Sequence, residues 1–181
     1  MLSAETQFHR LSVEDVYRMV DAGVLREEDR VELIDGFLID VSPPGAEHSA
    51  AVAWLTRHLV GAVGGREVRV QDLLLVEGGF VMPDLMVIDP LPRDRHPSTA
   101  ALVVEVAATT HRHDAWKAQR YARAGVAEYW IVDLPGRALT VHRKPGADGY
   151  GEVACHEDGD RIRTPVGAPV VEIGALLGPR P

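Results

Sequence analysis

The sequence predicts an α/β fold, in which a mixed central sheet is flanked by helices and followed by an antiparallel meander near the C-terminus. Three observations lead to this prediction. A continuous apolar run at 101–106 is typical of a strand buried on both faces. A helical segment and a second apolar run at 128–133 follow, which is the order of a parallel crossover unit. From residue 138 onward, short strand-like runs alternate with glycine-containing turns.

Length and composition predict one globular domain over residues 1–181. Hydrophobic residues make up 46% of the chain and charged residues 25%, as in ordinary folded proteins. A single cysteine, Cys155, cannot form an internal disulfide, and we expect it to be a small buried or half-buried side chain rather than a nucleophile. The N-terminal segment has no signal-peptide pattern, and no apolar run reaches the roughly 18 residues of a membrane span. We therefore expect a cytoplasmic protein.

The net charge limits the ways in which the chain can bind nucleic acid. Its formal value is −8, which argues against a large nonspecific nucleic-acid footprint, since such a footprint needs clustered lysine and arginine. The charge is still compatible with a local basic rim around a site.

The N-terminal third predicts a helix, a hairpin and a second helix. Residues 11–25 have an amphipathic pattern, with Ser12 as the expected N-cap and a stop at Gly23. Residues 31–41 form two apolar runs about Asp35-Gly36, a pair favoured in two-residue hairpin turns, and Glu32 lies on the first run. A second amphipathic helix is expected at 47–60.

The middle of the chain predicts the strands and helix of the core. We expect a strand at 66–76, a turn at 77–79, a strand around Asp84 and a surface loop at 90–99. The central strand at 101–106 carries Glu105, and the helix at 112–124 carries Lys117 and ends at Gly125. The strand at 128–133 completes the crossover, and further strands are expected at 138–143, 150–156 and 169–173.

Two acidic residues lie in strongly apolar runs on neighbouring strands. A charged side chain in such a run is costly unless something neutralises it, and a divalent metal ion is one candidate for Asp84 and Glu105. A metal there would neutralise a phosphate and acidify a water molecule. A nearby lysine such as Lys117 would position that water or stabilise developing negative charge.

These residues resemble a nuclease family. Pro83-Asp84 and the following Glu105 resemble the PD-(D/E)XK pattern, and an ordered set of segments is similar to the Uma-two restriction-endonuclease family over roughly residues 13–141. The segments are ELIDG, PPGAEHSAAV, VQD, PDLMVI, LVVEV, the helix with Asp114, Lys117 and Tyr121, and AGVAEYWIVD.

The resemblance implies a restriction-endonuclease-like fold and an endonuclease that hydrolyses DNA with Mg²⁺ or Mn²⁺. Asp84 and Glu105 would bind the metal, while Lys117 and Glu32 would complete the catalytic set. A homodimer is compatible with cutting both strands of a duplex.

The chain departs from the family pattern in two places. Ala107 stands where the superfamily has its lysine, and Lys117 matches a position to which that lysine is displaced on the next helix. The segment between Glu105 and Asp114 is about one residue shorter than the family spacing, and Ala108-Thr109-Thr110 replaces a Ser-Pro-Ser sequence.

Other roles remain open for several residues. Glu32 is balanced between a site carboxylate and an exposed strand residue, whereas His48 and Gln71 are expected to cap, pack or form hydrogen bonds rather than to act in the cleft. Packing is also the expected role of three aromatic residues: Tyr121, Tyr129 and Trp130.

Two alternative functions follow from these features. The missing lysine and the acidic charge also suit a nuclease-like scaffold that binds nucleic acid or a protein without catalysis. A zinc hydrolase using His111 and His113 is disfavoured, because adjacent residues at a helix start rarely converge on one ion, and Asp114 then simply caps the helix.

Overall fold

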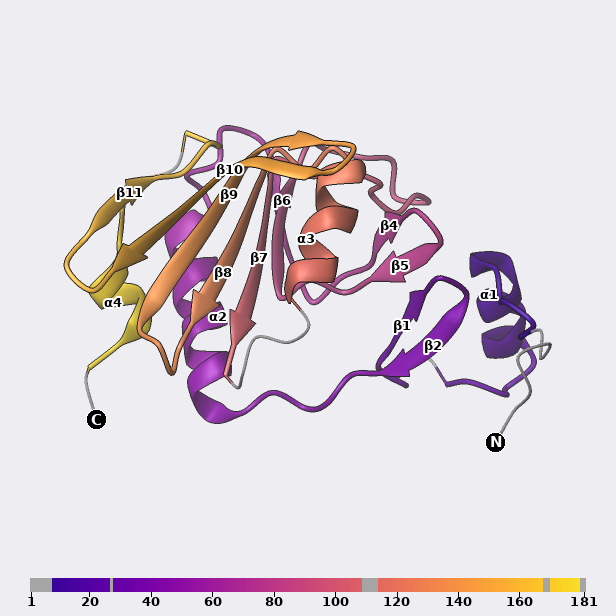
Figure 1. Cartoon of the computed structure of the whole chain (residues 1–181). Coiled ribbons are helices and arrows are strands. Elements are labelled where there is room, and N and C mark those ends of the chain that lie inside the picture. Colours follow the sequence, from indigo (N-terminus) through magenta and orange to yellow (C-terminus); the bar gives the residue numbers. More distant parts are fainter. Residues whose placement is uncertain (1–7, 27, 109–113, 168–169, 180–181) are drawn as a thin grey trace.

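A six-stranded mixed sheet and a four-stranded antiparallel sheet carry the fold (Figure 1). The computed structural model describes residues 8–26, 28–108, 114–167 and 170–179. Its helices are α1 (Val13–Asp21), α2 (Ala46–Leu59), α3 (Asp114–Arg123) and α4 (Ile173–Leu177). Its strands are β1 (Val31–Ile34), β2 (Phe37–Asp40), β3 (Glu67–Val70), β4 (Leu74–Val76), β5 (Gly79–Val81), β6 (Leu85–Ile88), β7 (Leu102–Ala107), β8 (Glu128–Asp133), β9 (Ala138–Gly146), β10 (Gly149–Glu157), β11 (Arg161–Arg163) and β12 (Val170–Glu172).

The larger sheet has the order β10-β9-β8-β7-β6-β3. Strands β7 and β8 are parallel and are connected through α3, whereas every other neighbouring pair in this sheet is antiparallel. The predicted crossover unit and the predicted central position of the 101–106 run are thus confirmed. Strands β9 and β10 are the first two strands of the antiparallel meander expected from residue 138 onward, and β9 pairs with β8.

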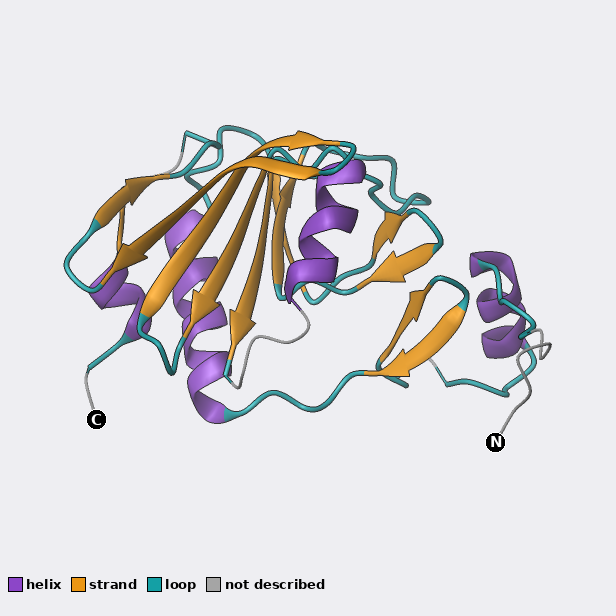
Figure 2. Ribbon diagram, viewed as in Figure 1, coloured by secondary structure: helices purple, strands orange, loops and turns teal. Residues whose placement is uncertain are grey.

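Alternation along β7 divides the core between the two faces of this sheet. Leu102, Val104 and Val106 pack with α2 in one hydrophobic cluster. Val103 belongs to a second cluster with residues of α3, so Glu105, two residues further on, points to the α3 face. Figure 2 shows the strands fanned out between these helices.

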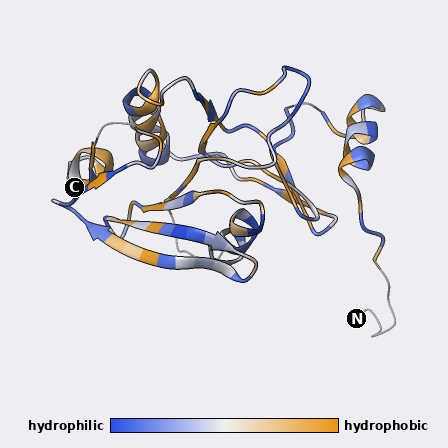
Figure 3. Cartoon of the chain, turned by 90° about the horizontal axis from the view of Figure 1, so that it is seen from above, coloured by the Kyte–Doolittle hydropathy of each residue, from blue (hydrophilic) through white to orange (hydrophobic). Residues whose placement is uncertain are grey.

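The smaller sheet has the order β2-β1-β5-β4, and α1 packs on it. Its hairpin turns at Asp35 and Gly36, which both have positive φ, as the Asp-Gly pair predicts. Helix α1 begins as predicted with a capping box between Ser12 and Asp15. The mixture of hydrophilic and hydrophobic residues along α1 is visible in Figure 3.

The run at 66–76 is not one strand, contrary to the prediction. Strand β3 pairs in the six-stranded sheet, β4 pairs in the four-stranded sheet, and the chain turns between them at Gln71, where φ is +49°. A left-handed conformation at a non-glycine residue leaves no obvious mark in the sequence. Asp84 likewise lies between β5 and β6 rather than inside a strand.

The C-terminal part differs from the prediction in three details. The 169–173 run divides into β12 and the first residue of α4, and β12 pairs with an additional strand, β11. Cys155 is exposed rather than buried, because β10 is the edge strand of its sheet.

None of the helices within the described residues has the length and apolar character that crossing a membrane requires.

Candidate active site

The acidic pair lies where β6 begins beside β7 in the larger sheet. Leu85 pairs with Val104 and Met86 with Val103, so the register continued by one residue places Asp84 opposite Glu105. Alternation puts the Glu105 side chain on the α3 face, whereas Asp84 lies in the bend before β6. The prediction that the two residues lie on neighbouring strands therefore holds for Glu105 but not for Asp84. Asp84 occupies the turn into β6 and Glu105 the interior of β7.

Lys117 joins two carboxylates from different sheets. Its Nζ donates to Glu105 Oε1 at 3.0 Å and to Glu32 Oε1 at 2.9 Å. The side chains of Lys117, Glu105 and Glu32 are only 14%, 13% and 6% exposed. The structure therefore brings Lys117 to the acidic cluster, as expected for the amine missing at Ala107, and it shows that Glu32 is not an exposed strand residue.

Strand alternation explains the burial of Glu32. In β1, Leu33 points toward α1, while Ile34 packs in the cluster of α3, so Glu32 shares the face of Ile34. Its carboxylate also accepts a hydrogen bond from the backbone N–H of Met82 at 3.0 Å. Two donors thus compensate for its removal from water.

Asp84 is fixed by a helix and by a strand. Its Oδ2 accepts a hydrogen bond from the backbone N–H of Val106 at 2.8 Å and lies 2.9 Å from His48 Nε2, in the first turn of α2. The hydrogen bond with Asp84 raises the pKa of His48. Of the capping, packing and hydrogen-bonding roles expected for His48, the structure shows a hydrogen bond, and its partner is the acidic pair.

Tyr121 is the site residue for which the sequence predicted only packing. Its side chain is fully buried, and its hydroxyl donates to Glu105 Oε1 at 2.7 Å. Tyr121 follows Lys117 by four residues on α3, and residues at that spacing share a helix face. That spacing was the available signal that both side chains reach Glu105.

Burial and charge act together on the cluster. Burial raises the pKa of Glu105 to about 7; Lys117 opposes this shift, while the charge of Asp84 adds to it. Burial would lower the pKa of Lys117, but Glu105 and Glu32 outweigh it and raise the pKa, so the amine stays protonated. Asp84 raises the pKa of Glu105 because two carboxylates that lie close together repel each other when both are charged.

Comparison with known proteins assigns the chain to a family. Residues 13–175 match the family model described as "Uma2: Putative restriction endonuclease". The chain belongs to the Uma2 family.

A solved structure supports the fold of this Uma2 chain. The crystal structure of "a putative nuclease belonging to DUF820 from Anabaena variabilis ATCC 29413" superposes with a TM-score of 0.72 at 14% identity, covering 92% of this chain and 97% of that one. The predicted restriction-endonuclease-like mixed sheet is confirmed at the level of fold. No curated protein matches the chain.

The acidic pair of this Uma2 chain fits a hard divalent cation. The described residues give no hydrogen bond to Asp84 Oδ1 or Glu105 Oε2, so each carboxylate has one oxygen held by the protein and one left for a ligand. Mg²⁺ commonly uses one or two carboxylates and takes its other ligands from water and phosphate. In keeping with so small a protein ligand set, the described ranges contain no group of three or more His, Cys, Asp or Glu placed to hold a metal.

Other predicted residues lie beside the cluster or outside the described part of the chain. The backbone N–H of Gln71 donates to the carbonyl of Asp84 at 3.2 Å, so Gln71 borders the site through its main chain. His111 and His113, on which the zinc alternative depends, fall outside the described residues. Helix α3 begins at Asp114.

Proposed function

We propose that this Uma2 chain is a metal-dependent endonuclease that hydrolyses phosphodiester bonds in DNA. One observation carries the proposal: the Lys117 amine contacts Glu105 and Glu32, and the register of β6 and β7 places Asp84 opposite Glu105. An acidic pair with an adjacent buried amine is the set that the nuclease pattern requires, although Ala107 breaks that pattern on the strand. The family and the fold support the same reaction class.

Asp84 and Glu105 would hold Mg²⁺ or Mn²⁺ through their carboxylate oxygens. When bound, such an ion supplies positive charge for the phosphate and lowers the pKa of water. Val106 and His48 fix Asp84 Oδ2, and Tyr121 fixes Glu105 Oε1, so the remaining oxygens are oriented before substrate arrives.

Lys117 would act as a fixed cation. Since its pKa is raised, it does not serve as a base at neutral pH. Its three N–H donors satisfy two carboxylates and leave one for a phosphate oxygen as negative charge develops. Glu32 would hold the amine in place between the two sheets.

The proposal is tested by cleavage of supercoiled DNA in Mg²⁺ or Mn²⁺. We expect Asp84→Asn, Glu105→Gln and Lys117→Met each to lower the rate by on the order of 100-fold or more, because each removes a group that acts on the developing charge. Asp94→Asn, at an exposed loop position, is the matched control and should cleave like wild type. Circular dichroism establishes that every variant is folded.

Calorimetric titration of Mn²⁺ into chelator-treated protein distinguishes residues that bind the metal from residues that assist cleavage in another way. Wild type should bind the ion, and Glu105→Gln should lose that binding. Full cleavage by both folded carboxylate variants would refute the assignment of the acidic pair.

A binding module is the second candidate, and one observation favours it. Lys117 already neutralises Glu105 and Glu32 by direct ion pairs, so the cluster is partly compensated without any metal. In that case wild type would bind DNA or a protein with the same affinity in chelator and in Mg²⁺, and no cleavage would accompany binding.

A further inference from the structure

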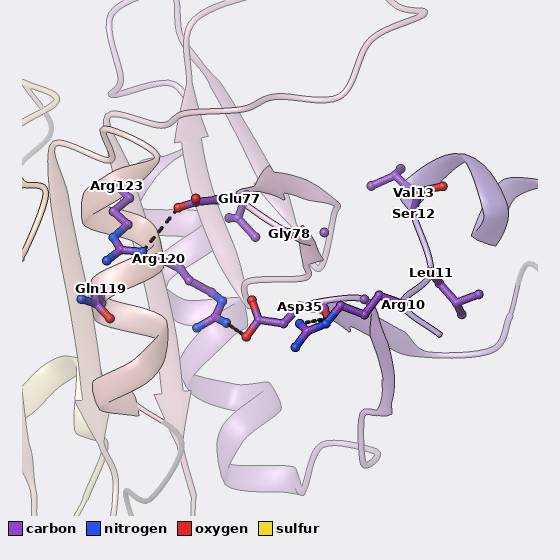
Figure 4. A pocket seen from close by; sticks show the side chains of 13 residues that line it. Arg10, Leu11, Ser12, Val13, Asp35, Glu77, Gly78, Gln119, Arg120 and Arg123 are labelled. Atoms are coloured by element: carbon purple, nitrogen blue, oxygen red, sulfur yellow. Dashed lines mark hydrogen bonds and ion pairs between the residues drawn. The ribbon is translucent and has the colours of Figure 1, made fainter. Parts of the chain in front are cut away.

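A pocket lined by arginines lies further along α3 from Lys117. This pocket has a volume of about 820 Å³ and is lined by residues of α3, the start of α1, the β1–β2 turn and the β4–β5 turn. Three arginines from two segments line it: Arg10, which precedes α1, and Arg120 and Arg123 of α3. Figure 4 shows Arg10 and Arg120 reaching Asp35 from opposite sides and Arg123 directed toward Glu77.

Helix α3 connects this arginine pocket to the candidate active site. Lys117, Arg120 and Arg123 follow one another at intervals of three residues, and each contacts an acidic residue of the smaller sheet or its turns. At a rise of 1.5 Å per residue, the two arginines lie roughly 4.5 and 9 Å beyond Lys117 along the helix axis. The pocket is therefore a neighbour of the acidic cluster.

Arg120 is held in place with donors to spare. One Nη donates to Asp35 Oδ2 at 2.5 Å, and the guanidinium carbon lies 4.9 Å from the centroid of the Trp116 ring. Its Nε is buried and has no hydrogen-bond partner among the described residues. A guanidinium has five N–H donors in a rigid fork, and the contact with Asp35 uses one of them, so Nη donors of Arg120 remain for a ligand.

The other two arginines are anchored in the same partial way. Arg10 donates from Nη1 to the backbone carbonyl of Asp35 at 2.7 Å, and its guanidinium lies over Phe37. Arg123 donates from Nε to the carbonyl of Ala147 at 3.0 Å, and its contact with Glu77 is long, at 3.4 Å. The Glu77 side chain is 74% exposed, so a stronger anion can replace it at Arg123.

Two glycines allow the β1–β2 turn and the β4–β5 turn to pack closely against each other and against Arg10. A Cβ on Gly36 would lie 2.5 Å from Arg10 Cβ, and a Cβ on Gly78 would lie 3.1 Å from a carboxylate oxygen of Asp35. The N–H of Gly36 donates to the carbonyl of Gly78 at 3.2 Å. The turns thus hold each other in position, and the arginines project from a fixed frame.

We propose that the arginine pocket binds backbone phosphates of the DNA strand next to the bond that is cut. The inference rests on the proposed function and deepens it. Arginine forks match the geometry of phosphate oxygens. Since nucleotides follow one another at 3.4 Å along a duplex, the arginines reach phosphates roughly one to three nucleotides from Lys117. A net charge of −8 requires such contacts to be local, and this pocket provides them.

The test is DNA binding in the Glu105→Gln background, where cleavage does not interfere. Fluorescence anisotropy of a labelled 20-base-pair duplex is followed against salt concentration in chelator. Arg10→Gln and Arg123→Gln should each weaken binding by about 5-fold near physiological salt and reduce the salt slope by about 0.9, the value for one lost phosphate contact. The control is Arg57→Gln, an exposed arginine of α2 outside the pocket, which should bind as its parent does.

Glu77→Gln provides a change in the opposite direction. It removes the anion that competes at Arg123, so DNA should bind more tightly. If the Arg123–Glu77 pair were only structural, Glu77→Gln and Arg123→Gln would weaken binding together, and the proposal would be overturned.

The outcomes separate the pocket from the active site. Unchanged affinity and salt slope in both arginine variants, with wild-type cleavage intact, would overturn the pocket alone. Arginine-dependent binding with cleavage that survives in Asp84→Asn and Glu105→Gln would overturn the active-site assignment alone. No DNA binding by the parent protein would overturn both.

Discussion

At the scale of single residues, the carboxylate of Glu105 is held in place by two side chains of one helix, α3. Lys117 and Tyr121 both donate to Glu105 Oε1, at 3.0 and 2.7 Å. Because a charged donor and a neutral donor together fix one oxygen, they also fix the direction in which the other oxygen of the carboxylate points. Ala107 lacks the amine of the nuclease pattern on the strand, and α3 supplies the amine and a hydroxyl instead.

The hydroxyl of Tyr121 is therefore expected to matter for cleavage. Tyr121→Phe keeps the buried ring and removes one hydrogen bond from a proposed metal ligand. Loss of such a supporting contact commonly costs about 10- to 100-fold in metal affinity or activity. DNA cleavage and Mn²⁺ titration should both report this loss.

The matched control for that variant is Tyr17→Phe, at a tyrosine of α1 that is 43% exposed. It should leave both measurements unchanged. Wild-type cleavage by a folded Tyr121→Phe protein would show that the hydroxyl serves only the packing of the core.

At the scale of elements, β8 and β9 are joined by a buried polar cluster at the end of the sheet opposite to the loop after β7. Glu128 is 3% exposed and accepts hydrogen bonds from Trp130 Nε1 at 2.7 Å and from Arg143 Nε and Nη2 at 3.0 Å each. All three groups come from strands that pair side by side. One carboxylate thus satisfies a buried indole and a guanidinium together.

Removing that carboxylate should destabilise the fold. Glu128→Ala leaves the Trp130 N–H without its acceptor, and the expected loss is about 3 kcal/mol of unfolding free energy, measured by urea titration. The loss is moderate because the Arg143 side chain is 37% exposed and regains water.

Glu152→Ala is the control for the β9–β10 hairpin, because it breaks only the exposed pair with Lys144. It should cost no more than about 0.5 kcal/mol. Equal losses in the two variants would show that burial of Glu128 does not decide the effect.

The same hairpin contains a group that should respond to alkaline pH. Tyr150 donates to the carbonyl of Val126 at 2.9 Å, and burial, together with the charge of Glu128, raises its pKa above the ordinary value of 10.0. The folded state therefore keeps the proton while the unfolded chain releases it above about pH 10. Proton release favours the unfolded state, so unfolding free energy should be unaffected by this group below pH 10 and should fall as pH rises beyond it.

The measurement is the unfolding free energy of wild type relative to Tyr150→Phe between pH 8 and pH 11. Phenylalanine removes the ionisation, so the difference between the two proteins should shrink at the alkaline end. A difference that stays constant across this range would contradict the role assigned to the tyrosine.

At the scale of the whole molecule, two sheets meet at the acidic cluster. Glu32 comes from the four-stranded sheet, and Glu105 comes from the six-stranded one. Local pattern was sufficient for the elements themselves: the Asp35-Gly36 turn, the Ser12 cap and the strand-helix-strand order around Lys117 were all predicted. Each of these depends on neighbours in the sequence.

Features that depend on distant parts of the chain were harder to predict. A glutamate in a short strand suits an exposed face, and Glu32 is buried because Lys117, 85 residues away, covers it. His48 satisfies the rules for a helix start whether or not Asp84 lies beside it. The break at Gln71 follows from the pairing of β3 and β4 in separate sheets, which the continuous apolar run does not reveal.

The contribution of the four-stranded sheet to the site can be tested at Gly79, the first residue of β5. A Cβ at this position would lie 1.9 Å from the carbonyl oxygen of Leu33 in β1, a backbone atom that has no room to move away. Gly79→Ala should therefore separate β5 from β1, cost about 3 kcal/mol of unfolding free energy and displace Glu32 from Lys117. DNA cleavage should fall even under conditions where most of the variant is folded.

The control is Gly151→Ala, where the added Cβ meets nothing closer than 3.6 Å. It should change stability by no more than about 0.5 kcal/mol and leave cleavage intact. A stable Gly79→Ala protein with full activity would mean that the four-stranded sheet contributes nothing to the site.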